Sequence, residues 1–574
     1  MSAPVTVIGL PGRTPGQMRR RFRWPAWDSF NVAAACCDAH PRSRPALIYQ
    51  DARSALRVIT FGEASELSSR LANAYTGLGL RPGDRVAVCL PQRPETAIAH
   101  LAAYRAGLVA VPLSALFGPD ALSYRLGDSG ARVLVTDADG LERSRDLPGA
   151  GSLDAVIVVS DATGPARPAA GRAGGGSRGP GRPGSPGRPL IARFDDLIAD
   201  ASPARPAAVS RGDDPCLLIY TSGTTGPPKG VLHAHRVLVG QAPGFRLGHE
   251  YTPRPGDRFW TPADWAWVGG LVNSLLLAWL HGLTVVAAYR QRFDPDWAWD
   301  LMARHQVRNA FLPTTALRML LQATGGPGVR LRTIVSGGEA QEQDLLDRCV
   351  SRFGIGFNES YGQTEADFIV GNCAARWPVR PGSAGIGFPG HDVATMRDDG
   401  TLCDPGEIGE IVVRGPDPVF LLQYWHRPEA SEAKYRGGWL RTGDLASLDD
   451  AGYLWFHARA DDVIKSSGYR IGPAEVEGCL LRHPAVREAA VVGAPDRLRG
   501  QVVQAYIVTS APPAPGLEDE LRQFVRDRLA AYQYPRVISF VEELPFTATK
   551  KVDRAELRRR AAAAAANGGT ADER

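Results

Sequence analysis

The sequence predicts an α/β protein: a large N-terminal domain of two αβ subdomains plus a β-rich subdomain, followed by a small, mobile α+β C-terminal domain. Three observations support this prediction. Short β-branched runs alternate with helical periodicity over much of the chain, Gly turns and short strands dominate from Ala384 to Phe456, and a compact αβ pattern follows Asp462. At 574 residues, the chain also exceeds the length of one ordinary domain.

The first part of the chain, residues 45–144, has the alternation typical of βαβ units. Buried parallel strands are expected at Arg85–Leu90 and Arg132–Thr136 because both runs are almost wholly apolar. Helices are expected at Glu63–Leu78 and Glu95–Ala106, where apolar residues recur with helical spacing.

Residues 164–189 interrupt this alternation. The segment is rich in Gly, Pro, Arg and Ser and has almost nothing apolar to bury, so we expect a disordered surface insertion. Strands and helices resume at Cys216 and continue to about Asn372. The apolar stretch Leu271–Tyr289 contains several polar residues, so we expect a buried helix and then the strand Leu283–Ala288, not a membrane span.

Composition and charge exclude several classes of protein. The chain is 44% hydrophobic and 22% charged, with a net charge of +5 and arginines spread along its length. A nucleic-acid binder would need a concentrated basic face, so no nucleic-acid partner is expected. The eight cysteines form no C-x-x-C pair, and the N-terminus has no hydrophobic signal core. We therefore expect a cytoplasmic protein without disulfides or a zinc site, and its oligomeric state, including a homo-oligomer, stays open.

The most informative segment is Leu218–His235. An apolar strand, Cys216–Tyr220, runs into a loop of glycines, hydroxyl residues, prolines and one lysine. Glycines allow close backbone approach, and successive N–H groups then form a concave anion site. The P-loop of kinases and GTPases is excluded, because Pro228 precedes Lys229 and Gly230 follows it.

A second segment, Asn358–Glu365, reads Asn-Glu-Ser-Tyr-Gly-Gln-Thr-Glu. Together with Tyr-Thr-Ser-Gly-Thr-Thr-Gly-Pro-Pro-Lys-Gly at residues 220–230, it resembles the adenylate-forming superfamily of acyl-CoA synthetases, peptide-synthetase adenylation domains and luciferases. The resemblance extends from Pro45 to Arg554 and is closest to medium-chain and acetyl-type synthetases. It implies ATP, Mg²⁺ and coenzyme A as cofactors.

The resemblance implies a role for each matching residue. Tyr361 would stack on adenine, Thr364 would meet the α-phosphate, Glu365 would hold Mg²⁺ and Asp444 would bind the ribose hydroxyls. An oxygen ligand suits this hard cation, and a carboxylate suits two hydroxyl donors. The full set implied to contact ATP or AMP is Thr221, Ser222, Gly223, Thr224, Thr225, Gly226, Lys229, Gly338, Glu339, Ala340, Glu359, Ser360, Tyr361, Thr364, Asp444, Arg459 and Arg470.

The C-terminal part resembles the mobile domain of that superfamily. The implied division is an N-terminal domain at 1–458, a hinge at 459–462 pivoting on Asp461, a C-terminal domain at 463–560 and a disordered Ala-rich tail at 561–574. Ser467 and Gly468 would lie along coenzyme A, and Lys551 would be the catalytic lysine. A positioned cation there stabilises the charge that develops as pyrophosphate leaves.

Two residues depart from the family pattern. Lys550 and Ala458 stand where glycine is usual, which puts the geometry of the catalytic loop and of the hinge approach in question. We therefore keep a degenerate nucleotide-binding protein as an alternative.

The implied reaction joins a carboxylic acid to coenzyme A through an acyl-AMP intermediate, with release of AMP and pyrophosphate. The acyl pocket would be lined by Trp265, Trp267, Val268, Gly338 and Gly362. In acetate-specific relatives a tryptophan stands at the position of Gly362, so a deeper pocket for a medium-chain, branched or aryl acid is expected. An acetate or propionate ligase, and an enzyme that loads a carrier protein in trans, remain alternatives.

Overall fold

A computed structural model of the chain describes residues 9–10, 12, 14–160, 189–205, 207–208, 210–221, 228–326, 328–337, 343–459, 462, 464–466, 469–496, 500–529, 533–547 and 551–568. These residues form two compact units. The first comprises the described residues up to Thr221 and those within Lys229–Val393 and Arg414–Gly438. The second comprises Pro228, Ala394–Val413 and the described residues from Trp439 onward. The predicted insertion at 164–189 lies outside the described residues except for Pro189, and the division at 459–462 stays a prediction.

One sheet of the first unit has the strand order β16-β15-β14-β13-β12-β10-β11-β1-β2. Its strands are β1 (Pro45–Gln50), β2 (Leu56–Thr60), β10 (Arg258–Trp260), β11 (Thr284–Ala288), β12 (Asn309–Phe311), β13 (Thr333–Gly337), β14 (Asn358–Gln363), β15 (Ala366–Gly371) and β16 (Gly385–Gly387). The strands from β1 through β11, β10, β12 and β13 to β14 are parallel, whereas β2, β15 and β16 pair antiparallel to their neighbours. Parallel pairing brings the carboxyl ends of β13 and β14 together, with Gly337 opposite Ser360.

The second sheet of this unit has the order β19-β9-β8-β4-β3-β5-β6-β7. Its strands are β3 (Arg85–Cys89), β4 (Val109–Leu113), β5 (Val133–Thr136), β6 (Ala155–Val158), β7 (Leu190–Arg193), β8 (Pro215–Thr221), β9 (Lys229–Ala234) and β19 (Gln423–Tyr424). Strands β3 to β8 are parallel, and β9 and β19 complete one edge in antiparallel pairing. The strands predicted at 85–90, 132–136 and 216–220 are confirmed as β3, β5 and β8.

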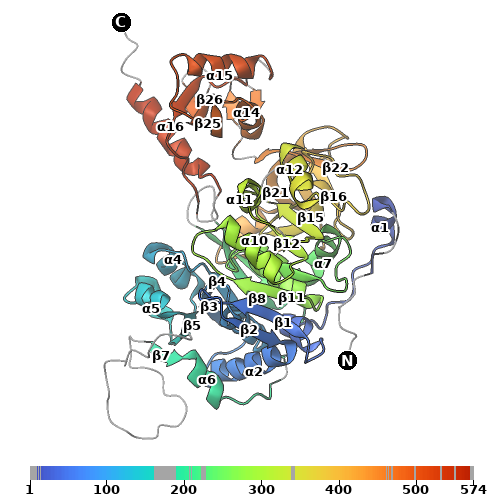
Figure 1. Ribbon diagram of the computed structural model, residues 1–574, viewed down its shortest axis with the longest axis vertical. Helices are drawn as coiled ribbons and strands as arrows, with labels where there is room; N and C mark the ends of the chain where they lie inside the picture. Colours follow the sequence, from blue (N-terminus) through green and yellow to red (C-terminus); the bar gives the residue numbers. More distant parts are fainter. Residues whose placement is uncertain are drawn as a thin grey trace. The chain divides into compact units, whose positions relative to one another are not determined.

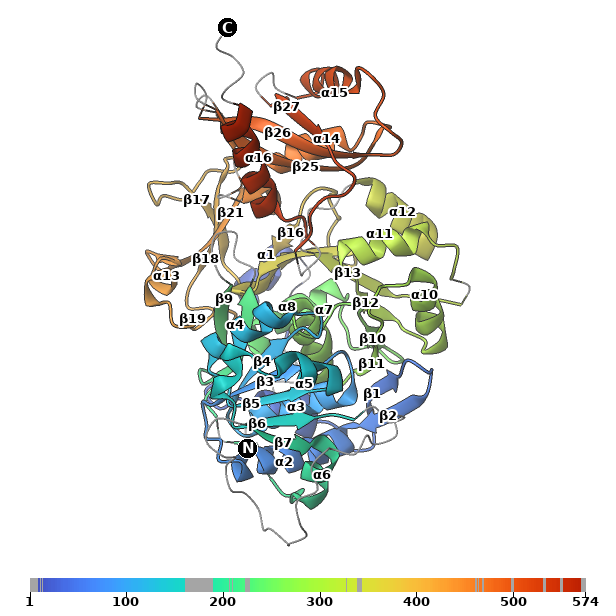
Figure 2. The same ribbon diagram turned by 90° about the vertical axis from the view of Figure 1, so that its left-hand side faces the viewer.

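Helices cover both sheets. Those of the first unit are α1 (Pro15–Arg21), α2 (Phe61–Gly77), α3 (Pro94–Arg105), α4 (Pro119–Ser129), α5 (Ala138–Ser144), α6 (Phe194–Asp200), α7 (Val237–Gly248), α8 (Val268–Gly270), α9 (Leu277–Leu280), α10 (Pro295–Arg304), α11 (Thr314–Gln322), α12 (Gln343–Phe353) and α13 (Pro428–Glu432). Two π-helical segments, η1 (Ala34–Asp38) and η3 (Leu271–Leu276), and a 3-10 helix, η2 (Pro148–Ser152), belong to the same unit. Figure 1 shows α2 beside β1 and β2, and Figure 2 shows α3 and α5 next to strands β3 to β6. The helices predicted at 63–78 and 95–106 are confirmed as α2 and α3.

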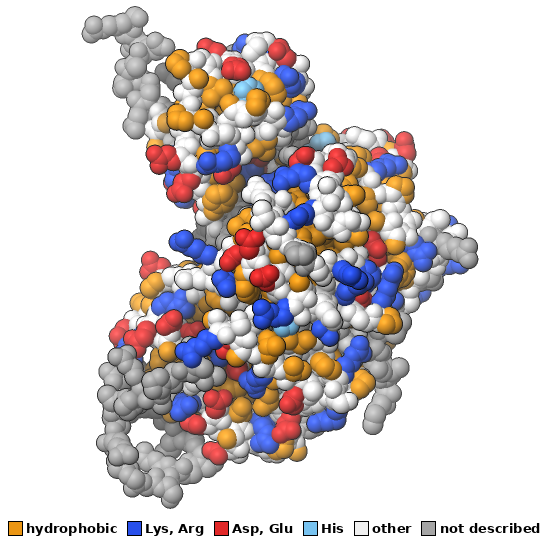
Figure 3. All heavy atoms as spheres, viewed as in Figure 1, with side chains coloured by type: hydrophobic (Ala, Val, Ile, Leu, Met, Phe, Trp, Pro, Cys, Tyr) orange, Lys and Arg blue, Asp and Glu red, His pale blue; other side chains and the backbone are white. Residues whose placement is uncertain are grey.

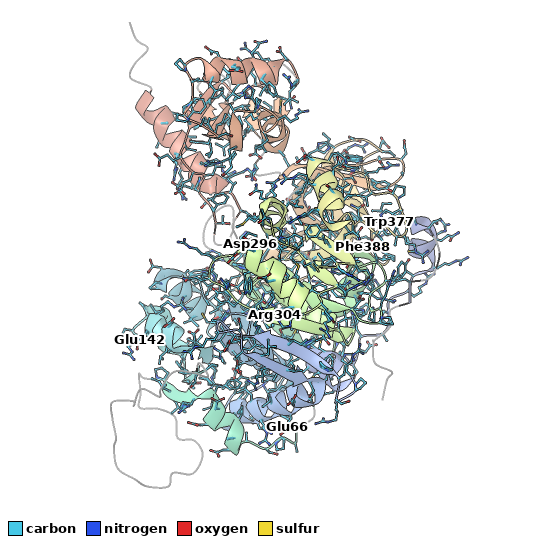
Figure 4. The ribbon with its side chains drawn as sticks, in the orientation of Figure 1. Glu66, Glu142, Asp296, Arg304, Trp377 and Phe388 are labelled. Carbon is cyan, nitrogen blue, oxygen red and sulfur yellow. The ribbon has the colours of Figure 1, made fainter. Side chains whose placement is uncertain are left out.

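Local sequence accounts for where these helices begin. Thr60 caps α2 in a capping box with Glu63, each side chain accepting a hydrogen bond from the other residue's backbone N–H. Helix α10 carries Asp296 in its first turn and Arg304 in its last (Figure 4). Both charges are favourable to the helix dipole. The apolar stretch from Leu271 forms η3 and α9 and then the strand β11, as predicted.

The second unit contains two sets of strands. The first set has the order β17-β18-β21-β22, with β17 (Val393–Met396), β18 (Gly409–Arg414), β21 (Trp439–Leu448) and β22 (Tyr453–Arg459). The second set has the order β24-β23-β26-β25, with β27 beside β26; its bounds are β23 (Ile464–Ser466), β24 (Tyr469–Ile471), β25 (Val486–Asp496), β26 (Gly500–Thr509) and β27 (Val537–Phe540). The predicted strand at 489–492 is confirmed as part of β25.

The helices of the second unit are α14 (Pro473–Leu480), α15 (Leu517–Arg526) and α16 (Arg554–Gly568). Figure 2 shows α16 alongside β25. The prediction of disorder from residue 561 is wrong for residues 561–568, which continue α16. Alanine has the highest helix propensity, and Ala561 is buried in a cluster with Leu557 and Val492.

Candidate functional site

The predicted phosphate loop lies between β8 and β9 at the edge of the second sheet. Thr221 ends β8 and pairs with Lys229, which begins β9, and the Thr221 hydroxyl donates to the Lys229 carbonyl at 3.4 Å. The strand therefore ends where the sequence predicted. Ser222, Gly223, Thr224, Thr225 and Gly226 lie outside the described residues.

The turn between β14 and β15 carries Thr364 and Glu365, and three contacts hold it. His233 of β9 donates from Nε2 to the Thr364 carbonyl at 2.7 Å. Leu421 N donates to the Glu365 carbonyl at 3.0 Å, and the Tyr424 hydroxyl donates to Glu365 Oε1 at 2.5 Å.

Tyr424 also contacts the lysine of the phosphate loop. Lys229 Nζ lies over the Tyr424 ring, 5.3 Å from its centroid, within the range of a cation–π interaction. Lys229, Thr364 and Glu365, predicted from two segments far apart in the sequence, are thus linked within one unit. Sequence reasoning missed His233 and Tyr424, because no local pattern distinguishes either from a structural residue.

Strand β14 carries Glu359, Ser360 and Tyr361, three of the residues assigned to ATP or AMP. Glu359 is buried opposite Ser336 of β13, while Ser360 and Tyr361 are half-buried near the strand's carboxyl end. The Ser360 hydroxyl donates to the Ser336 carbonyl at 3.5 Å. Gly338, Glu339 and Ala340, which follow β13, lie outside the described residues.

The structure gives a reason for glycine at position 362 that the sequence alone did not reveal. A Cβ at this position would lie 2.6 Å from both Asp367 Cα and Phe368 N of β15. Glycine is therefore required by the close approach of two backbones, in addition to any effect on pocket depth. Asp367 is held in turn by Asn273 of η3, whose amide donates to its carboxylate at 2.7 Å.

The other predicted pocket residues lie on the segment before η3. Trp265 is buried with 1% exposure, and Trp267 packs edge-on against Phe117 with ring centroids 5.9 Å apart. Val268 begins α8 and is half-buried. Trp265 is therefore part of the packed core, whereas Trp267 and Val268 are partly accessible.

In the second unit, Asp444 and Arg459 face each other across β21 and β22. They occupy paired positions, and Arg459 Nε lies 3.8 Å from Asp444 Oδ1. Asp444 is buried, and its backbone N–H donates to the Thr442 hydroxyl at 3.1 Å. Gly443 has a φ of +78°, a left-handed conformation that turns the chain just before Asp444. Asp444, assigned to the ribose, and Arg459, assigned to ATP or AMP, are thus adjacent.

The loop that carries Lys551 is closed by its own backbone. Thr547 N donates to the Lys551 carbonyl at 2.7 Å, and Phe546 forms an antiparallel bridge with Val552. The Lys551 side chain is exposed. Lys550, Asp461, Ser467 and Gly468 lie outside the described residues; Arg470 is in β24, but its side chain is not described.

Charge on the surface is mixed. On the face drawn in Figure 3, Lys and Arg side chains are interspersed with Asp and Glu. Within the part of the chain that the structure describes, every helix is too short or too polar to span a bilayer.

Comparison with known protein families identifies the family to which this chain belongs. The AMP-binding enzyme family matches residues 33–425, and the AMP-binding enzyme C-terminal domain matches residues 475–551.

The chain belongs to the AMP-binding enzymes.

Its relatives are acyl-CoA synthetases. This AMP-binding enzyme is 35% identical to the mitochondrial acyl-coenzyme A synthetase ACSM5 of Mus musculus, over 87% of this chain and 84% of that protein. It is 31% identical to the uncharacterized acyl–CoA ligase YtcI of Bacillus subtilis, over 90% of this chain and 93% of that protein. Its fold matches the crystal structure of the anthranilate CoA ligase AuaEII in complex with anthranoyl-AMP, with a TM-score of 0.80 and 28% identity, covering 94% and 98% of the two chains.

The predicted fold class is therefore confirmed, with mixed α/β sheets in a large N-terminal part and a smaller C-terminal part. The predicted activity is also confirmed at the level of the reaction. The AMP-binding enzyme is an AMP-forming acid–CoA ligase that uses ATP, coenzyme A and a small carboxylic acid.

Five buried histidines make the stability of this AMP-binding enzyme depend on pH. Burial lowers the pKa of His100 and His249 to about 3, and that of His233, His235 and His281 to about 4, from an ordinary value of 6.5. Below pH 6.5 the unfolded chain therefore takes up protons that the folded chain does not. The free energy of unfolding should fall as the pH falls from 6.5 towards 4, by on the order of 1 kcal/mol per histidine at pH 5.5.

Thermal unfolding at pH 7.5, 6.5 and 5.5 measures this effect. We expect a Tm several degrees lower at pH 5.5 than at pH 7.5. A Tm that stays constant over this range would show that these histidines are protonated in the folded protein.

Proposed function

We propose that this acyl-CoA synthetase activates a medium-chain, branched or aryl carboxylic acid. The observation that carries the proposal is Gly362, which extends no side chain at the position where acetate-specific relatives have a closing indole. Trp267 and Val268, which the resemblance also assigns to the acyl pocket, are partly accessible apolar side chains. An anthranilate ligase with anthranoyl-AMP bound has the same fold, which supports the aryl alternative.

The proposed adenylation reaction gives a separate role to each of the predicted residues. Thr221 and Lys229, with the loop between them, would hold the phosphates of ATP. Thr364 would contact the α-phosphate, and Tyr361 would lie against the adenine. Asp444 and Arg459 would bind the ribose, since a buried carboxylate beside a guanidinium can accept hydrogen bonds from two hydroxyls.

Glu365 fits the proposed Mg²⁺. It supplies one half-buried carboxylate at a turn that is fastened through its backbone and side chain. Mg²⁺ keeps several waters and binds proteins through one or two carboxylates together with substrate phosphates. When bound, the ion would offset the charge of the phosphates; the residues of this chain hold and orient them.

The second half-reaction would follow a rotation about the hinge at 459–462. In this proposal Lys551 acts only in adenylation, and Ser467 and Gly468 lie along the path of coenzyme A in thioester formation. Rotation about a few residues can assemble two sites in turn. One chain can then catalyse both adenylation and thioester formation, which take place at the same acyl carbon but need different residues around it.

Release of AMP over a panel of acids tests the proposed substrate class. With ATP, Mg²⁺ and CoA, we expect kcat/KM for acids of six to ten carbons or for benzoates to exceed that for acetate by at least about tenfold, because each buried CH₂ contributes about 0.8 kcal/mol. Reactions without CoA are the control. Acetate or propionate as the best substrate would contradict the proposal, and turnover with a purified carrier protein but not with CoA would favour the carrier-loading alternative.

A further inference from the structure

Tyr424 lies between two residues that the proposed function assigns to ATP and its metal. Its hydroxyl donates to Glu365 Oε1 at 2.5 Å, and Lys229 Nζ lies 5.3 Å from its ring centroid. We propose that Tyr424 is a positioning residue that holds both the Glu365 carboxylate and the Lys229 ammonium in place for the metal–nucleotide complex. This inference rests on the proposed function, in which Glu365 binds Mg²⁺ and Lys229 binds phosphate.

Strand pairing in the second sheet positions Tyr424 beside Lys229. Strand β19 pairs antiparallel with β9, so that Tyr424 stands opposite Val231. Backbone bonds on either side continue the pairing, from Leu422 N to the Leu232 carbonyl and from Trp425 N to the Gly230 carbonyl, each at 2.7 Å. Lys229 begins the same strand, β9. The tyrosine and the lysine are therefore held in register by one ladder of hydrogen bonds.

The segment before β19 is anchored independently. Nη1 of Arg236 donates to the carbonyls of Asp417, Pro418 and Phe420 at 3.2, 2.8 and 3.3 Å. Leu421 N then donates to the Glu365 carbonyl. Glu365 is thus held to this one segment at two points, its backbone by Leu421 and its carboxylate by Tyr424.

The two contacts of Tyr424 suit a positioning role. A phenol that donates to one carboxylate oxygen fixes the plane of the carboxylate and leaves the acceptor positions of the other oxygen for a cation. Groups that orient a metal ligand in this way affect metal affinity about ten- to a hundredfold. Tyr424 is 4% exposed, so its ring is fixed by packing and presents a constant face to the ammonium.

Isothermal titration with the ATP analogue AMPCPP, which cannot form acyl-AMP, tests the inference without turnover. Affinity is measured in EDTA and in Mn²⁺, and the ratio of the two gives the gain due to the metal. For Tyr424→Phe, which keeps the ring, we expect this gain to fall at least about tenfold with little change in EDTA. For Tyr424→Leu, which also removes the ring, we expect a further two- to fivefold loss in EDTA.

Two other variants complete the experiment. Tyr435→Phe is the matched control, because it removes a hydroxyl that lies 3.5 Å from the Leu421 carbonyl and leaves Glu365 untouched; it should bind like the unmodified protein. Glu365→Gln should lose the metal gain. If Glu365→Gln keeps the gain in affinity due to the metal, Glu365 does not bind Mg²⁺, and the inference about Tyr424 is wrong as well.

The inference alone is overturned if Glu365→Gln loses the metal gain while Tyr424→Phe keeps it. Equal affinities of Tyr424→Phe and Tyr424→Leu in EDTA would overturn the link to Lys229.

Discussion

Lys551→Ala should lower the rate of acyl-adenylate formation by about a hundred- to a thousandfold, the usual cost of removing one group that stabilises charge in a transition state. The same variant should still form the thioester from synthetic acyl-AMP and CoA at nearly the normal rate, because in our proposal Lys551 acts only in the first step. Pyrophosphate release and acyl-CoA formation from acyl-AMP, measured separately, give the two rates.

The structure makes this variant a clean test. The Lys551 side chain is exposed, and the loop is closed through the backbone of Lys551, whose N–H donates to the Thr547 hydroxyl and whose carbonyl accepts from Thr547 N; alanine retains both groups. The Tm should therefore stay within a degree or two. Lys550→Ala is the matched control, since it removes the neighbouring charge. If Lys550→Ala loses adenylation and Lys551→Ala does not, the alignment of this loop is wrong by one residue.

Asp417→Ala is expected to destabilise the protein by about 2–5 kcal/mol, because the buried ring of His391 and the buried N–H of Val419 each lose their partner, at about 1–3 kcal/mol apiece. Asp417 Oδ2 lies 2.7 Å from Nδ1 of His391, and both side chains are at most 1% exposed. The other ring nitrogen of His391 faces the Gly240 carbonyl at 3.1 Å. A carbonyl only accepts hydrogen bonds, so Nε2 is the donor to Gly240 and Nδ1 faces the carboxylate of Asp417.

Thermal unfolding of three variants measures how much the Asp417–His391 pair contributes to stability. Asp417→Asn should cost much less than Asp417→Ala, because its amide can donate to Nδ1 of neutral His391 while its carbonyl accepts from Val419 N, as the carboxylate does. Glu142→Ala (Figure 4) is the control, since Glu142 and Arg145 form an exposed pair worth at most about 1 kcal/mol. Equal effects of Asp417→Ala and Glu142→Ala would contradict the prediction.

Much of the site could be predicted because its residues lie in continuous segments. The end of β8 at the phosphate loop follows from the apolar run Cys216–Tyr220 and from the glycines and hydroxyl residues after it. The predicted disorder is wrong at residues 561–568, because the high helix propensity of alanine and the burial of Ala561 extend α16 through this low-complexity stretch.

The contacts of Tyr424 and His233 could not be predicted in this way. Tyr424 is 59 residues from Glu365 in the chain, and it reaches the carboxylate only because β19 joins the edge of the sheet beside β9. His233 reaches the Thr364 carbonyl across 131 residues. Gly362 shows the same limit, since the approach of Asp367 is set by the pairing of β14 with β15.

Local sequence was thus sufficient for the α/β class, for the strand that ends at the phosphate loop and for the type of reaction, because each depends on residues close together in the chain. The tertiary structure alone decided which groups hold Glu365, why residue 362 is glycine and which charges are buried in pairs. These features depend on strand order and on backbone approach between distant segments, and neither leaves a periodic pattern in the sequence.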